Sequence, residues 1–158
     1  MLKVEILTDP TLAETLHTIL HEAFLPYIDL YTPGAFAATV VSAATLEARI
    51  SSENYNVYGC YLEDALAGTV STKLNEKGDL YFMSMAVATQ CSGKGIGKAL
   101  LNAIENEAKE KRCRAIVLET YAPLLDAIRL YEKNGYSRTG NRRDYSGIEI
   151  FEMEKILS

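Results

Sequence analysis

Residues 80–101, LYFMSMAVATQCSGKGIGKALL, place a loop with three glycines between a strand-like run and a helix-like run. The helix-like run has one apolar face, formed by Ile96, Ala99, Leu100, Ala103 and Ile104. Such a face is typical of a helix that packs on a sheet. The glycines let the main chain approach an anion, and the first N–H groups of a helix lack partners within the helix. The stretch therefore predicts a strand, an anion-binding loop and a helix, with a glycine-rich structural turn as the alternative.

The spacing of the glycines decides among the phosphate-binding patterns. A P-loop requires GxxxxGK[ST], but Ser92 stands where its first glycine would be, and Ala99 stands in place of its hydroxyl residue. The dinucleotide fingerprint GxGxxG also fails, because the run reads GxGxG. What remains is QxxGxG, from Gln90 to Gly95, opening a helix.

Outward from this stretch, strand and helix patterns alternate along the chain. The expected strands cover residues 3–8, 57–62, 66–74, 80–87, 115–121, 136–139 and 148–155. The expected helices cover residues 12–23, 37–50, 96–108 and 124–133, and an ordered aromatic loop covers 24–36. Because strand, helix and strand follow in order, strands 80–87 and 115–121 are predicted to be parallel neighbours. We expect one α/β domain over residues 1–158.

Composition argues against several classes of protein. The formal net charge of −5 disfavours a general nucleic-acid partner, because phosphate affinity needs clustered Lys and Arg. No long apolar run is present and the segment MLKVEILTDP does not look like a signal peptide, so we expect a cytoplasmic protein without membrane contact. The three cysteines lack CxxC spacing and the two histidines lack an HExxH pattern, so neither a disulfide framework nor a metal site is expected.

Three ordered runs carry a family resemblance: residues 80–101, IVLETY at 116–121, and AIRLYEKNGY at 127–136. Together they resemble the GNAT superfamily of acetyl-CoA-dependent N-acetyltransferases, with local similarity to ribosomal-protein alanine N-acetyltransferases. The resemblance implies a mixed, mostly antiparallel sheet of about seven strands. It also implies one splayed parallel pair of strands, and about four helices flanking the sheet.

The resemblance implies that acetyl-CoA is the co-substrate and that no metal takes part. The coenzyme pyrophosphate would lie on main-chain N–H groups of the glycine loop. The residues implied in binding it are Gln90, Gly93, Lys94, Gly95, Ile96, Gly97 and Lys98. The pantetheine arm would pair as an added strand segment with Met85, Ala86 and Val87.

The resemblance also implies two catalytic side chains. Tyr131 stands in LYEKNGY, where family members donate a proton to the departing thiolate, although it could instead be a core aromatic residue. Glu119 resembles the glutamate that serves as the base in ribosomal-protein N-acetyltransferases. A solvated carboxylate beside a water relay is the alternative for Glu119. Leu124 stands where such relatives commonly carry Asn, which leaves the coenzyme contacts near it open.

The family builds its acceptor site from two segments, which correspond here to residues 24–36 and to the loop NRRDYSG at 141–147. Phe24, Tyr27 and Tyr145 are candidates for an aromatic wall. Arg142 or Arg143 could meet a carboxylate.

The predicted function is the transfer of an acetyl group from acetyl-CoA to a primary amine of a small molecule, amino acid or peptide. The amine would attack directly in a ternary complex, on a monomer or homodimer. Two alternatives stay open: a catalytically silent acetyl-CoA-binding sensor, and a non-enzymatic interaction domain.

Overall fold

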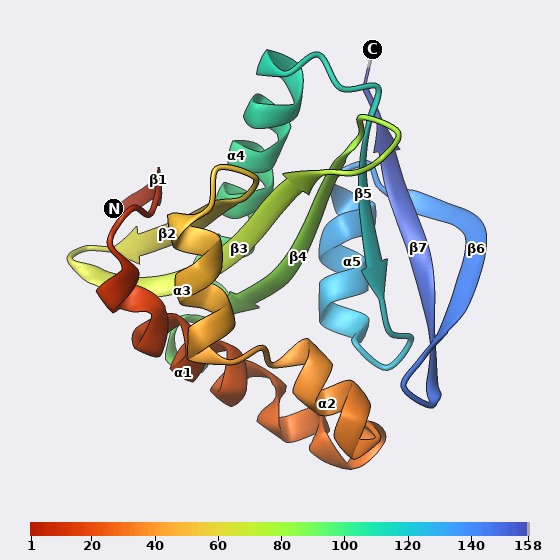
Figure 1. Ribbon diagram of the computed structural model, residues 1–158, viewed down its shortest axis with the longest axis horizontal. Coiled ribbons are helices and arrows are strands. Elements are labelled where there is room, and N and C mark those ends of the chain that lie inside the picture. The colour runs from red at the N-terminus through yellow and green to blue at the C-terminus, as the bar shows by residue number, and fades with distance from the viewer. Residues whose placement is uncertain (158) are drawn as a thin grey trace.

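The computed structural model describes residues 1–157 and contains a seven-stranded sheet with helices on both faces (Figure 1). Its strands are β1 Leu2–Ile6, β2 Asn56–Leu62, β3 Ala65–Leu74, β4 Leu80–Val87, β5 Ala115–Thr120, β6 Ser137–Tyr145 and β7 Ile148–Ile156. Its α-helices are α1 Ala13–Phe24, α2 Pro33–Thr39, α3 Ala43–Ser51, α4 Ile96–Glu110 and α5 Leu125–Lys133. Three short 3-10 helices are η1 Pro10–Leu12, η2 Leu25–Leu30 and η3 Thr89–Cys91.

The strands lie in the order β1-β2-β3-β4-β5-β7-β6. The β4–β5 pair is parallel, and the other neighbouring pairs are antiparallel. The connection from β4 to β5 contains α4, as the succession of strand, helix and strand predicted. The predicted fold class, a mixed and mostly antiparallel sheet with one parallel pair, is therefore confirmed.

Two groups of helices cover opposite faces of the sheet, with α1, α2 and α3 in front of it and α4 and α5 behind it in Figure 1. The core under α4 and α5 includes Leu80, Leu100, Ile104, Leu118 and Ile128. The core under α1 and α3 includes Leu16, Leu20, Leu46, Val57 and Ala86. Successive side chains of a strand point to opposite faces. Glu119, which follows Leu118, therefore points to the face covered by α1 and α3.

β4 and β5 separate after a short parallel ladder. Leu80 pairs with Ile116 and Tyr81 with Val117, whereas β4 continues to Val87 without further β5 partners among the described residues. The register between β3 and β4 shifts near Ser84, which has a φ of 54°. A bulge of this kind bends a strand and increases its twist. Figure 1 shows the two strands diverging beyond the ladder.

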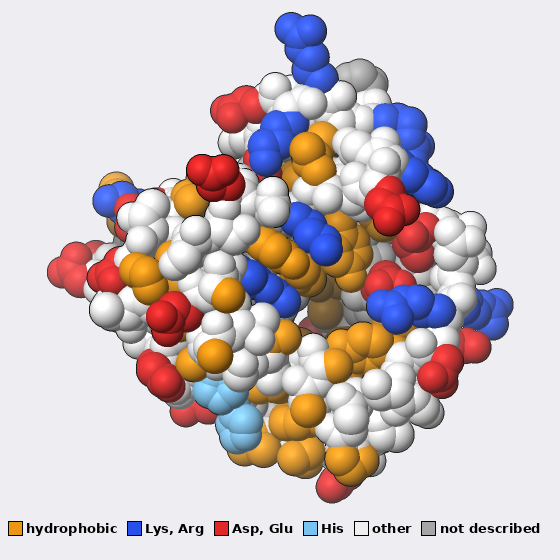
Figure 2. All heavy atoms as spheres, in the orientation of Figure 1, with side chains coloured by type: hydrophobic (Ala, Val, Ile, Leu, Met, Phe, Trp, Pro, Cys, Tyr) orange, Lys and Arg blue, Asp and Glu red, His pale blue; other side chains and the backbone are white. Residues whose placement is uncertain are grey.

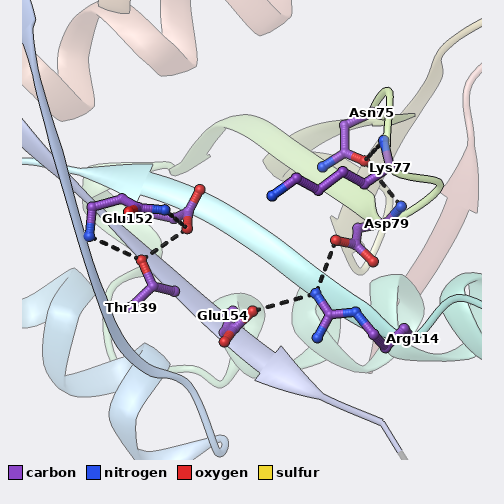
Figure 3. A network of polar contacts seen from close by, with 8 residues as sticks. Asn75, Lys77, Asp79, Arg114, Thr139, Glu152 and Glu154 are labelled. Carbon is purple, nitrogen blue, oxygen red and sulfur yellow. Dashed lines mark hydrogen bonds and ion pairs between the residues drawn. The ribbon is translucent and has the colours of Figure 1, made fainter.

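A polar network fastens the paired end of β4 to β5 and β7 (Figure 3). The buried Asp79 accepts a hydrogen bond of 3.2 Å from Arg114, whose guanidinium also lies 3.7 Å from Glu154. Asn75 holds the preceding turn by accepting hydrogen bonds of 3.0 Å from the N–H groups of Lys77 and Asp79. The two parallel strands are thus tied together at one end and open at the other.

The helix expected over residues 37–50 is two helices. α2 begins earlier than expected, because Thr32 caps its N-terminus and Pro33 occupies its first turn. α3 begins after Ser42, whose hydroxyl accepts a hydrogen bond from the N–H of Thr45. These two capping residues are the sequence signals that the single-helix prediction missed.

The segment 141–147, expected to be a loop, is mostly strand. β6 extends to Tyr145, and a turn at Ser146 and Gly147 leads into β7. β6 is an edge strand whose side chains are all exposed or half-buried. It therefore lacks the alternation of apolar and polar residues by which a strand with one buried face is recognised.

Glu107 on α4 is a buried carboxylate within a hydrogen-bond network. It accepts hydrogen bonds from Tyr58 at 2.7 Å, Thr72 at 2.8 Å and Lys111 at 2.7 Å. Burial by itself would raise the pKa of Glu107, but the hydrogen bonds from Lys111, Tyr58 and Thr72 outweigh it and lower the pKa. The charged form is therefore the one that the folded protein favours.

We expect Glu107→Ala to lower the free energy of unfolding by about 3 kcal/mol, because it leaves two buried hydroxyls without their acceptor. A carboxyl with a lowered folded-state pKa stabilises the protein above its unfolded pKa of about 4.3 and loses that contribution as the pH falls further. Urea unfolding from pH 7 to pH 3 should therefore show a smaller acid-dependent loss in Glu107→Gln than in the wild type. Glu110→Ala, an exposed change on the same helix, is the control; an equal loss in Glu110→Ala would contradict this role of Glu107.

Within residues 1–157, no helix combines the length and the apolar character that crossing a bilayer requires.

Candidate active site

The glycine loop forms a cradle of main-chain N–H groups at the start of α4. Gly93 and Gly95 have φ values of 78° and 80°, a conformation that residues with a Cβ rarely adopt. A Cβ built on Gly93 would meet no heavy atom within 4 Å, so the space beside the loop is open. The N–H groups of residues 93–98 donate to no main-chain acceptor in the described chain, and no side chain caps α4. This cradle suits a phosphate group in geometry and in the sign of its electrostatic potential.

The side chains of the loop divide into two kinds. Those exposed beside the cradle are Gln90, Lys94 and Lys98. Ile96 is buried in the core, so it presents its main chain alone to the cradle. A Cβ on Gly97 would lie 2.6 Å from the Cδ2 atom of Leu130, which shows that this glycine allows α4 and α5 to pack closely.

A cavity of about 250 Å³ lies between the diverging strands, and Figure 2 shows the hollow near the centre of this face, bordered by hydrophobic and basic side chains. The strands contribute Met85 of β4 and Glu119 of β5 to its wall. The helices in front of the sheet contribute Phe24, Thr39 and Arg49. The cavity wall also includes Tyr131 of α5 and two residues of β6, Arg143 and Tyr145. The cavity therefore connects both faces of the sheet.

Tyr131 lines the cavity with a buried ring, 7% exposed. The ring packs in T-shaped contacts against Phe82, 5.8 Å away, and Tyr136, 6.1 Å away. The Tyr131 hydroxyl has no hydrogen-bond partner within residues 1–157. Every side-chain oxygen that is fully buried in these residues does have a partner. The hydroxyl must therefore retain accessible surface. Burial raises the pKa of Tyr131, so the phenol stays protonated at neutral pH.

Glu119 lies in the cavity wall as the less exposed member of an ion pair with Arg143. Arg143 donates hydrogen bonds of 2.6 Å and 2.8 Å to the two carboxylate oxygens, and Tyr81 donates a third of 3.2 Å. The hydrogen bonds to Glu119 raise the pKa of Arg143. Arg143, expected as a ligand for an acceptor carboxylate, is thus engaged with a carboxylate of the protein itself.

The two segments expected to form the acceptor site meet in space. The Thr32 hydroxyl donates a hydrogen bond to the Ser146 carbonyl oxygen, which joins the aromatic segment to the β6–β7 turn. Phe24 and Tyr145 line the cavity as expected. Tyr27 lies on η2 and is half-buried, but it is not part of the cavity wall.

Three tyrosines in the cavity wall, Tyr31, Tyr81 and Tyr121, were missed from the sequence. Tyr31 and Tyr121 are in edge contact, with ring centres 5.0 Å apart, and the Tyr121 hydroxyl donates to the Leu30 carbonyl oxygen at 2.6 Å. Burial, followed by the neighbouring Tyr121, raises the pKa of Tyr31 to about 12. Tyr31 belongs to the aromatic segment 24–36, so its place in an aromatic wall could have been predicted.

Arg49 and Leu124 also line the cavity. Arg49 lies in the last turn of α3, and no pattern near it in the sequence indicated a site. Leu124 directly precedes α5 and gives that helix no side-chain cap. At position 124 this chain therefore presents an apolar side chain to the cavity.

Comparisons with known proteins agree with this fold. The family model described as an acetyltransferase (GNAT) domain matches residues 21–157. The chain is 29% identical over 108 residues to the spermine/spermidine N(1)-acetyltransferase of Bacillus subtilis, a match covering 63% of this chain and 70% of that relative.

Among solved structures, one similar fold is the PaiA N-acetyltransferase of Thermoplasma acidophilum in complex with coenzyme A. It has a TM-score of 0.82 and 21% identity, with 99% of each chain covered. Another is the ribosomal-protein-S18-alanine N-acetyltransferase of Escherichia coli. It has a TM-score of 0.78 and 21% identity, with 100% of this chain and 95% of that chain covered.

The chain belongs to the GNAT acetyltransferase family. It is an N-acetyltransferase. The family resemblance read from residues 80–136 is therefore confirmed. No three His, Cys, Asp or Glu side chains in the described chain lie together as a set of metal ligands.

Proposed function

We propose that residues 1–158 form one catalytic domain that acetylates the primary amine of a small molecule, amino acid or peptide. The amine attacks acetyl-CoA directly while both substrates are bound. The observation that carries this proposal is the cavity between the splayed strands. It brings the unpartnered hydroxyl of Tyr131 and the carboxylate of Glu119 into one wall, reached from both faces of the sheet.

The coenzyme binds along the open end of β4. Its pyrophosphate accepts hydrogen bonds from the N–H groups of residues 93–98, with Gln90, Lys94 and Lys98 beside it. Its pantetheine arm pairs with Met85, Ala86 and Val87, whose main chain has no β5 partner. The thioester thereby reaches the cavity from the side of α4 and α5.

Acetyl transfer forms a carbon–nitrogen bond and breaks the carbon–sulfur bond of the thioester. A main-chain N–H near Val87 stabilises the developing oxyanion. Tyr131 gives its hydroxyl proton to the departing thiolate sulfur, which makes the thiol a better leaving group. The acylated nitrogen loses its surplus proton to solvent as the amide forms, and the phenolate regains a proton from solvent. The absence of a competing hydrogen bond to Tyr131 within residues 1–157 supports this role.

The attacking amine must be neutral, and deprotonating an alkyl amine with a pKa near 10 costs about 4 kcal/mol at pH 7. We propose that Glu119 accepts this proton, while Arg143 and Tyr81 hold the carboxylate in position. Glu119 lies on the face of the sheet that α1 and α3 cover, which is opposite to the coenzyme cradle. A chain of water molecules is the alternative base.

We expect Glu119→Gln to lower kcat/KM at pH 7 by about tenfold or more, with the activity recovering as rising pH supplies the neutral amine. The measurement is the pH profile of thiol release. Glu152→Gln is the matched control, because Glu152 is the β7 ladder partner of Glu119 and lies outside the cavity wall. A loss below about threefold in Glu119→Gln would assign the base to water instead.

The names of the relatives suggest different acceptors. The Bacillus subtilis relative is named for spermine and spermidine, and the Escherichia coli structure for an alanine of a ribosomal protein. A polyamine carries several positive charges, which need carboxylates in the site. Glu119 is the sole carboxylate in the described cavity wall, and Arg143 already pairs with it. This favours an amino acid or peptide over a polyamine.

The test of the proposed function is thiol release from acetyl-CoA with a panel of amines, combined with melting of the protein with and without acetyl-CoA. A ligand of the native state raises the melting temperature. We expect both a raised melting temperature and thiol release. A raised melting temperature without release by any amine would indicate a donor-binding protein without the proposed transfer.

A further inference from the structure

Arg49 brings an unpaired positive charge to the wall of the cavity. The charged side chains in that wall are Arg49, Glu119 and Arg143, and the last two neutralise each other in their ion pair. No carboxylate in the described chain lies within 4.0 Å of the Arg49 guanidinium, the limit for an ion pair. The wall of the cavity therefore carries a net positive charge.

Two serines and a tyrosine orient this guanidinium without neutralising it. The Nη1 atom of Arg49 donates to Ser71 Oγ at 3.2 Å and to Ser84 Oγ at 2.9 Å. Its Cζ atom lies 5.5 Å from the centre of the Tyr55 ring, within the range of a cation–π interaction. Ser84 belongs to the bulge at which β4 turns away from β5, so the guanidinium is held at the open end of the strands.

The remaining donors of Arg49 are available to a ligand. The Nε and Nη2 atoms of Arg49 have no hydrogen-bond partner within residues 1–157. Every side-chain nitrogen that is fully buried in these residues has such a partner. These atoms therefore keep accessible surface. A guanidinium with free parallel donors matches the two oxygens of a carboxylate. Burial also lowers the pKa of Arg49, which means that the charged form lacks the solvation it has in water.

The position of Arg49 separates it from the coenzyme phosphates. α3 packs on the face of the sheet opposite to α4, whereas the anion cradle lies at the start of α4. With the coenzyme bound on the α4 side, Arg49 lies on the side of the cavity that is left for the acceptor. Phe24 and Tyr31, which also line the cavity, provide apolar surface for the rest of that molecule.

We propose that Arg49 binds the carboxylate of the acceptor, and that the acceptor is a free α-amino acid. The inference rests on the proposed function and narrows its acceptor class. The amine of such a molecule lies next to its carboxylate, so an anchored carboxylate limits where the amine can reach the thioester. A peptide amine or a diamine lacks this neighbouring carboxylate.

The test compares kcat/KM for thiol release with L-amino acids and with their primary carboxamides, which differ in the charge that Arg49 would bind. Wild type is measured beside Arg49→Gln, Arg49→Lys and Lys73→Gln, with 1,4-diaminobutane as a third kind of amine. Lys73 is the matched control: its Nζ lies 5.6 Å from the same Tyr55 ring, but it does not line the cavity.

We expect the ratio of acid to amide in kcat/KM to fall at least about tenfold in Arg49→Gln. Arg49→Lys, which keeps the charge but loses the planar fork, should give an intermediate ratio, and Lys73→Gln the wild-type ratio. Acids and amides differ in intrinsic reactivity, but this difference is the same for every variant. It therefore drops out when the acid-to-amide ratio of one variant is compared with that of the wild type. The melting temperature with acetyl-CoA checks that each variant folds and binds the donor.

Two results would overturn the inference and can be told apart. Transfer to amides or to the diamine, with a ratio unaffected by Arg49→Gln, removes the role of Arg49 and leaves the proposed function standing. Absence of thiol release with every amine removes both. Should Arg49→Gln fail to fold, the ratio in Arg49→Lys decides: a wild-type ratio there counts against the paired-carboxylate geometry.

Discussion

Replacing Tyr131 with phenylalanine is expected to lower kcat by about 10²-fold, the contribution typical of a positioned proton donor. The affinity for acetyl-CoA and the stability of the fold should change little. The hydroxyl has no hydrogen-bond partner in the described chain, so its removal leaves no donor or acceptor unsatisfied. The ring keeps its contacts with Phe82 and Tyr136. Steady-state thiol release, acetyl-CoA binding and thermal melting measure the three quantities.

Tyr136→Phe is the control for this prediction. Tyr136 is as buried as Tyr131, packs in the same aromatic group and does not line the cavity. Loss of its hydroxyl should leave kcat within about twofold of wild type. Equal losses in the two variants would show that the aromatic group supports the fold and does not supply the proton.

The pH dependence of kcat gives a second check on Tyr131. Burial raises its pKa above the ordinary value of about 10, so the donor form persists through neutral and mildly alkaline pH. We therefore expect no descending limb in the wild-type kcat profile below about pH 9.5. A limb near neutral pH that disappears in Tyr131→Phe would contradict the raised pKa of Tyr131, because it would show the phenol ionising in the neutral range.

The parts of the molecule that could be predicted from the sequence are continuous in the chain. The strand, glycine loop and helix of residues 80–101 occupy one segment, so their order could be predicted, while an anion cradle and a glycine-rich structural turn both fitted the loop. The run 127–136 likewise carries Tyr131 within a recognisable pattern. The parallel pairing of β4 and β5 followed from the order of elements, because a single helix connects them.

The parts that were missed depend on packing between distant segments. Arg49 reaches the cavity because α3 lies over the bulge at Ser84, and neither residue identifies the other in the sequence. The pairing of Glu119 on β5 with Arg143 on β6 likewise requires the order β5-β7-β6, in which β7, the last strand in the chain, lies between them. Local patterns carry no information on such partners.

The two faces of the sheet divide the work of the site. Elements on the α4 and α5 side supply the phosphate cradle and Tyr131, the groups that would act on the coenzyme. Elements on the other side supply Arg49 and Glu119, the groups that would act on the acceptor. The splay of β4 and β5 is what lets the two sets meet. A direct attack in a ternary complex is the chemistry that suits such an arrangement.

Gly93→Asp is expected to weaken the binding of acetyl-CoA by about 10²-fold, because it puts a carboxylate beside the pyrophosphate. An added Cβ at Gly93 meets nothing in the protein, so the new side chain would occupy the open space of the cradle without a clash. The residue must still adopt a φ of 78°, which costs about 1 kcal/mol for a residue with a Cβ. Calorimetric titration with coenzyme A measures the change in affinity.

Gly78→Asp separates the charge from the backbone strain. Gly78 has a φ of 81° and equally open surroundings, but it lies in the turn before β4, at the closed end of the parallel pair. The two variants should therefore lose similar stability, while Gly78→Asp binds the coenzyme like wild type. Equal affinity in both variants would mean that the phosphates bind elsewhere. Weakening that persists at high salt would argue for distortion of the loop, because a repulsion between exposed charges is screened within about 3 Å at 1 M salt.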